Sequence, residues 1–182
     1  MFGKKVFSGR ELNSKPRCIS QNSFASMFPE FMEHISNHGQ KVTLRKEEAR
    51  KYAGKTYTGP LIFCAAVAVI CIVMYLLWRI PYSFSVFITF SIATLICGLI
   101  IRSKIKLAES GNYEVYRLEV KEKLWYADTD SDGTAYSFYV RSGDVTIEIG
   151  KKQYMLVRSH ILAFVYPVRI PPFKADYEFF AD

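Results

Sequence analysis

The run Asp128-Thr129-Asp130-Ser131-Asp132-Gly133 has the residue types and spacing that begin a calcium-binding loop. The twelfth position of an EF-hand loop must be a glutamate that binds the ion through both oxygens, and this chain has Tyr139 there. The flanking residues also alternate as strands do. We therefore predict an acidic hairpin turn, with Asp128, Asp130 and Asp132 as candidate ligands for a weakly held cation.

The three histidines are candidates for metal binding or for general-base chemistry. Glu30, His34 and His38 recur every four residues, which would place them on one face of a helix, but no nearby cysteine or aspartate completes a site. His160 follows Ser159, yet a catalytic pair needs a third group to orient the imidazole, and the sequence identifies none. The sequence predicts no catalytic residue, no metal centre and no cofactor site, which favours a protein that is not an enzyme.

The cysteines and the net charge exclude further classes of site. The chain lacks any C-x-x-C pair, so zinc and dithiol chemistry are not expected. Most of the cysteines lie inside apolar runs and should behave as small hydrophobic residues. The net charge of +7 comes from lysines and arginines near the N-terminus and beside the apolar runs. Anionic lipid headgroups are therefore the expected partner, and nucleic acid is not.

Residues Leu61 to Ile101 contain a single formal charge, Arg79. A helix needs about 20 apolar residues to cross a hydrocarbon core of roughly 30 Å, and a run of nearly that length lies on each side of Arg79. We predict a transmembrane helical hairpin over residues 60–102, with spans Leu61 to Trp78 and Ser83 to Ile101 and a turn at residues 79–82. The alternative is a buried helical hairpin in a soluble protein.

Basic residues flank the two spans on the side opposite Arg79, which predicts an integral, multi-pass membrane protein with both termini in the cytoplasm. The same residues are the predicted contacts with lipid headgroups. They are Arg45, Lys46, Arg50, Lys51, Lys55, Arg102, Lys104 and Lys106.

The N-terminal segment, residues 1–59, contains an apolar stripe at helical spacing that predicts an amphipathic helix over about residues 24–38. Its polar face carries Glu30, Glu33 and His34 in place of lysine and arginine, so the helix should pack on protein, either the chain's own domain or a partner. A short basic helix is predicted at about 44–53. The candidate partner-binding stripe comprises Phe24, Met27, Phe28, Phe31, Met32 and Ile35.

After Lys106 the apolar residues alternate, and residues 107–182 are predicted to form a β-rich cytoplasmic domain. About five short strands separated by turn residues indicate a small antiparallel β-barrel or curled sheet of OB or SH3-like size. The expected strands are 116–121, 136–140, 145–149, 153–157 and 161–168, followed by an aromatic tail, 173–182, packed on the barrel or on a neighbour.

These elements together describe a membrane α+β protein. The favoured hypothesis is an accessory or scaffold subunit of a membrane complex, which presents its β-rich domain to other membrane or cytoplasmic subunits or to further copies of itself. The alternative is a membrane-anchored sensor that binds a small molecule or a lipid against Tyr136, Phe138 and Tyr154. A membrane enzyme ranks below both.

Overall fold

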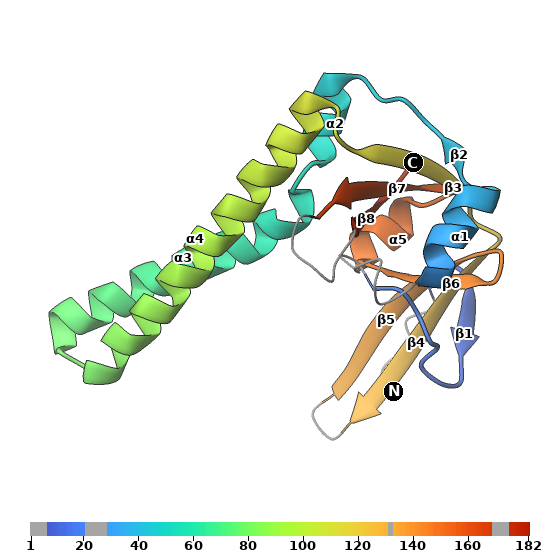
Figure 1. The fold of residues 1–182 in the computed structure, drawn as a ribbon. Helices are drawn as coiled ribbons and strands as arrows, with labels where there is room; N and C mark the ends of the chain where they lie inside the picture. The colour runs from blue at the N-terminus through green and yellow to red at the C-terminus, as the bar shows by residue number, and fades with distance from the viewer. Residues whose placement is uncertain (1–6, 21–28, 131–132, 169–174) are drawn as a thin grey trace. The chain divides into compact units, whose positions relative to one another are not determined.

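A computed structural model of the chain describes residues 7–20, 29–130, 133–168 and 175–182. The chain forms two compact units (Figure 1). One is helical and spans Leu44–Asn112. The other contains the sheets and is built from the residues that precede and follow the helical unit in the sequence. The β-rich unit therefore includes N-terminal residues as well as the predicted C-terminal ones.

The helical unit contains α2 (Lys46–Tyr52), α3 (Lys55–Trp78) and α4 (Pro81–Ser110). Helix α3 begins well before the predicted Leu61 and runs through Pro60, which removes one hydrogen bond near the start of the helix. Helix α4 continues past Ile101 to Ser110 and is capped by Gly111, whose φ of 73° favours glycine.

The connection between α3 and α4 consists of Arg79 and Ile80, and is shorter than the predicted four-residue turn. Arg79 caps α3 in the left-handed conformation, with φ 50°, and its N–H donates to the carbonyl of Tyr75 at 2.9 Å. Pro81 then opens α4 at the position that its fixed φ favours. The two green helices of Figure 1 therefore fold back as an antiparallel hairpin.

Many large apolar side chains are exposed along both α3 and α4. Leu76 and Leu77 are each 68% exposed, and Leu95 on α4 is 64% exposed. Both helices are long and apolar enough to cross a membrane. Between them, Ala68 is buried and the rings of Phe63 and Phe90 lie 6.2 Å apart.

The β-rich unit contains two four-stranded sheets, and neither closes into a barrel, so the predicted barrel is wrong. One sheet has the order β1 (Arg10–Leu12), β4 (Glu122–Asp130), β5 (Gly133–Ser142), β6 (Val145–Ile149). The other has the order β2 (Gln40–Lys41), β3 (Glu114–Glu119), β7 (His160–Pro167), β8 (Ala175–Ala181). All pairs are antiparallel except β1 with β4.

The sequence interpretation missed two long strands and misassigned one helix. Strand β4 leads into the acidic turn, and β8 was expected to be a packed tail. Residues 153–157 were predicted to be a strand but belong largely to α5 (Lys151–Leu156). Lysine, glutamine, methionine and leucine are good helix formers, and α5 contains no β-branched residue, so local propensity favours the helix.

One hydrophobic core joins the two sheets and includes Leu118, Phe138 and Ile147. Helix α1 (Pro29–His38) contributes Phe31 and Ile35, which are 0% and 1% exposed. The ring of Phe31 lies 5.0 Å from that of Tyr177 and 5.5 Å from that of Phe179. Helix α1 is therefore an integral part of the β-rich unit.

Candidate functional site

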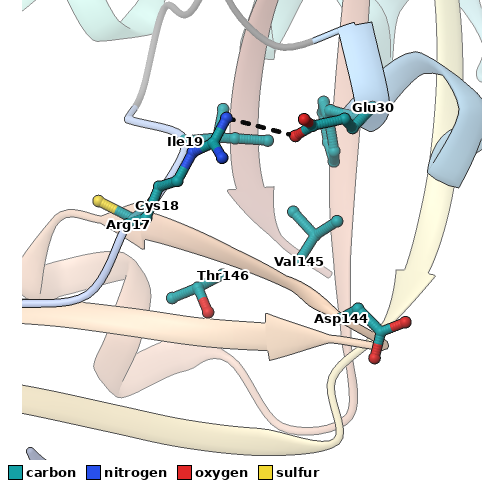
Figure 2. A pocket seen from close by; sticks show the side chains of 8 residues that line it. Arg17, Cys18, Ile19, Glu30, Asp144, Val145 and Thr146 are labelled. Atoms are coloured by element: carbon teal, nitrogen blue, oxygen red, sulfur yellow. Dashed lines mark hydrogen bonds and ion pairs between the residues drawn. The ribbon is translucent and has the colours of Figure 1, made fainter.

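A hollow of about 210 Å³ lies where residues 17–19, the start of α1 and the β5–β6 turn meet (Figure 2). Residues 17–19 reach it because Ile19 adds to the edge of β6 in the parallel direction. The Ile19 N–H donates to the Thr146 carbonyl at 2.9 Å, and the Glu148 N–H donates to the Ile19 carbonyl at 2.8 Å. We call this hollow the α1 cleft.

Charged side chains of both signs line the α1 cleft. The Arg17 guanidinium lies 3.5 Å from the Glu30 carboxylate, and both side chains are largely exposed, at 78% and 72%. Asp144 lines the cleft from the β5–β6 turn. An exposed ion pair contributes at most about 1 kcal/mol, so these groups can exchange their contact for charged groups of a docked chain at little cost.

Cys18 also lines the α1 cleft, but its thiol is not activated. Burial and the neighbouring Glu148 carboxylate raise the pKa of Cys18, and Lys15 opposes them. The thiol donates a long hydrogen bond to Glu148 Oε2 at 3.9 Å. Because the thiolate is the nucleophile, a raised pKa makes Cys18 less reactive at neutral pH.

His34 on α1 is buried, although the sequence places it on the polar face of that helix. Its Nε2 lies 3.3 Å from Ser142 Oγ, and its ring stacks on that of His38 with centroids 4.8 Å apart. Burial, followed by the nearby His38, lowers the pKa of His34, while Asp144 acts in the opposite direction. Among the side chains that the structure describes, no three histidine, cysteine or acidic residues gather as metal ligands.

Ser159 and His160, the candidate catalytic pair, are in contact but lie at the surface. Ser159 Oγ lies 2.8 Å from His160 Nδ1, and Glu119 faces His160 across the β3–β7 pair. A nucleophile with its base must be held where water is excluded and where an oxyanion can be stabilised. A surface position meets neither requirement, so this pair gives no support to an enzyme.

A second hollow, of about 400 Å³, lies against β5 and the start of α5 and is bordered by Phe7, Tyr136 and Lys151. Two of the three aromatic residues predicted to form a ligand pocket, Tyr136 and Phe138, border this hollow. Phe138 is only 5% exposed, however, and Tyr154 is fully buried. The rings of Phe138 and Tyr154 lie 4.9 Å apart. Most of this aromatic surface therefore fills the core.

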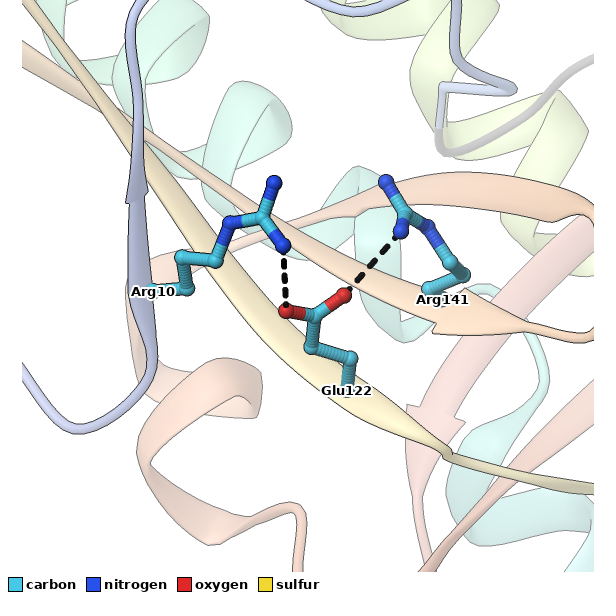
Figure 3. Close-up of polar contacts among 3 residues, drawn as sticks. All are labelled: Arg10, Glu122 and Arg141. Atoms are coloured by element: carbon cyan, nitrogen blue, oxygen red, sulfur yellow. Dashed lines mark hydrogen bonds and ion pairs between the residues drawn. The ribbon is translucent and has the colours of Figure 1, made fainter.

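An ion cluster ties β1 to the first sheet (Figure 3). The Glu122 carboxylate accepts from Arg10 through Oε1 at 3.4 Å and from Arg141 through Oε2 at 3.0 Å. All three side chains are at least 30% exposed. The cluster holds a short edge strand and does not form a site for a ligand.

The acidic run forms a β-hairpin, as predicted. Asp130 pairs with Gly133, whose φ is 138°, and Thr129 Oγ1 lies 3.4 Å from Thr134 Oγ1. Asp128 lies opposite Ala135 on the neighbouring strand. The Asp130 side chain and all of Asp132 lie outside the described residues.

The predicted partner-binding stripe is used inside the chain wherever the structure describes it. Phe31 and Ile35 are in the core, and Met32 packs against it. Of the two predicted alternatives, the structure therefore shows packing on the chain's own domain. Residues Phe24, Met27 and Phe28 lie outside the described residues.

Two of the predicted headgroup residues, Arg50 and Lys104, take part in contacts between the helices of the helical unit. Gly54 has a φ of 72°, and a Cβ there would lie 3.1 Å from the Ile101 backbone, so the chain after α2 passes close to α4. The Arg50 guanidinium lies 3.7 Å from the Glu109 carboxylate. Lys104 Nζ lies 4.8 Å above the ring of Tyr57.

Comparison with known proteins gives no relative from which a role could be transferred. No protein-family model, no curated protein and no solved structure matches this chain. The functional argument therefore depends on the residues and contacts described above.

Proposed function

We propose that the chain is a non-enzymatic membrane protein that anchors a β-rich interaction module to the cytoplasmic face of a bilayer. The observation that carries this proposal is the exposed apolar surface of α3 and α4. Ile62, Leu76 and Leu99 are each more than half exposed, and such a continuous surface is unfavourable in water and favourable in lipid. Basic residues flank the open end of the hairpin and Arg79 alone marks its turn, which supports cytoplasmic termini.

The α1 cleft is the proposed docking surface for a partner subunit. It lies at the edge of a sheet where residues 17–19 pair only briefly with β6. Arg17, Glu30 and Asp144 supply charges that can select a partner and fix its register. Cys18 is not activated, so the cleft is suited to binding rather than to covalent chemistry.

A sensor that binds a small molecule is the second candidate. The hollow beside Tyr136 and Lys151 supports it, since it combines aromatic surface with a cation. The burial of Phe138 and Tyr154 in the core argues against it, because a ligand pocket needs free apolar surface. We therefore favour the interaction module.

Two measurements test the membrane placement. Alkaline extraction of membranes should leave the full chain in the pellet, and tags at either terminus should resist an impermeant protease in sealed, right-side-out vesicles. Release into the supernatant would contradict the anchor, and cleavage of a tag would contradict the orientation.

Affinity isolation in mild detergent tests the partner. The wild-type chain should recover another subunit or a second copy in fixed stoichiometry. Arg17→Glu should release it, because the substitution adds a third acid to a cleft that Glu30 and Asp144 already line. Arg158→Glu makes the same charge change at another exposed position and should leave recovery intact. Recovery of the chain alone, or equal loss with both variants, would overturn the proposed docking surface.

A further inference from the structure

The helical unit contains a hollow of about 430 Å³ between the first part of α3 and the last part of α4. We call it the hairpin groove. On α4 its lining residues recur at the three- and four-residue spacing of a single helix face. They are Gly98, Ile101, Arg102, Ile105, Lys106 and Glu109, and Leu61 lines the groove from α3.

The hairpin groove changes in character across the face of α4. One side is apolar and is formed by Leu61, Gly98, Ile101 and Ile105. Gly98 leaves the backbone of α4 uncovered, since a Cβ there would meet only Leu61 Cδ1 at 4.0 Å. Gly98 and Ile105 are seven residues apart, about 10 Å along the helix axis, so the apolar side is long enough to hold part of an acyl chain.

The other side of the groove is cationic. Arg102 and Lys106 are both exposed and lie one helical turn apart on the same face. Glu109 also lines the groove, but Arg50 lies 3.7 Å from its carboxylate and offsets its charge. The close approach of Gly54 to Ile101 places the α2 segment, which carries Arg50, against the same part of α4.

We propose that the hairpin groove binds one anionic phospholipid, with an acyl chain on Leu61, Gly98 and Ile105 and the headgroup phosphate on Arg102 and Lys106. An apolar floor bordered by two cations is complementary to a molecule with an apolar body and an anionic head. The groove lies on helices whose remaining surface is also apolar and exposed, as a lipid site requires. This inference depends on the proposed membrane placement and extends it to a defined ligand.

The test measures which lipids remain bound to the purified full chain after extraction from nanodiscs of phosphatidylcholine and phosphatidylglycerol, by native mass spectrometry. Wild type should retain phosphatidylglycerol in preference to phosphatidylcholine. Replacing both cations, Arg102→Gln with Lys106→Gln, should reduce this preference roughly thirtyfold, since each cation near an anionic surface contributes about a factor of five. Both positions are exposed and glutamine is a good helix former, so the variant should fold.

A swap variant, Arg102→Ser with Ser103→Arg, separates a defined site from diffuse attraction. It keeps the net charge but moves the guanidinium by about 100° around the helix, away from the groove. The groove predicts a clear loss of preference for phosphatidylglycerol. An unchanged preference would show contact with annular lipid only and would overturn the proposal.

Gly98→Leu tests the apolar part, because the added side chain fills the groove and leaves every charge in place. It should reduce phosphatidylglycerol retention, and soluble glycerol phosphate should not displace the lipid from wild type. Retention equal to wild type in Gly98→Leu, or displacement by glycerol phosphate, would overturn the acyl-chain contact. Alkaline extraction of the same membranes separates the lipid site from the membrane placement. A chain that stays in the pellet but shows no lipid preference contradicts the lipid site alone, and a chain released into the supernatant contradicts the membrane placement.

Discussion

The imidazole of His34 lies 3.3 Å from the hydroxyl of Ser142, and this contact joins α1 to the end of β5. His34 also stacks on His38 along the helix. Burial lowers the pKa of His34, and His38 and Lys121 act in the same direction. The folded chain therefore favours neutral imidazole.

The β-rich unit should lose stability when His34 is protonated. Because the folded pKa lies below the ordinary value of about 6.5, the stabilisation is complete above that value and is lost as the pH falls through the folded pKa. Denaturant midpoints of the full chain in detergent, measured between about pH 5 and 8, should fall on the acid side. His34→Gln should flatten this dependence, whereas His160→Gln should retain it. An equal slope in wild type and His34→Gln would contradict the assignment.

Gly143→Ala should destabilise the β5–β6 turn. Gly143 has a φ of 55°, and a Cβ there would lie 2.7 Å from His34 Cε1. The left-handed conformation costs alanine about 1 kcal/mol before any displacement of the ring. Gly150→Ala is the matched control, because its φ is −66° and a Cβ there would meet nothing within 4 Å. Equal denaturant midpoints for the two variants would disprove the close packing of His34 on the turn.

Glu122→Gln should weaken the attachment of β1. It removes the charge shared by Arg10 and Arg141, and the exposure of all three side chains limits the loss to about 1 kcal/mol. A double-mutant cycle with Arg141→Met should show coupling that decreases with added salt. Coupling that does not respond to salt would indicate packing rather than charge.

Phe31→Ala should cost about 3–5 kcal/mol of folding free energy, because its ring is fully buried against Tyr177 and Phe179. Met32→Ala removes a partly buried side chain from the same helix and should cost less. Unfolding of the purified chain provides the measurement. A stable Phe31→Ala chain that has lost only partner binding would restore the interpretation of α1 as a docking helix.

The sequence of β8 has the pattern of a strand, although we predicted a packed tail there. Ala175, Tyr177 and Phe179 alternate with Asp176 and Glu178, as expected for a strand. The prolines just before this segment suggested instead that the chain had left the sheet. Pairing with β7 decided the outcome, because β7 supplies a full ladder of hydrogen-bond partners.

The sequence by itself determined the local features: the paired apolar helices, the hairpin at Asp130 and Gly133, the end of α1 at His38, and strand β6. Each depends on periodicity, charge or turn chemistry within a few residues. Only the tertiary structure decided that the strands form two open sheets, that Ile19 joins β6, and that Phe31 and His34 are buried. Those outcomes depend on contacts between segments distant in sequence, and no local pattern records which surfaces will meet.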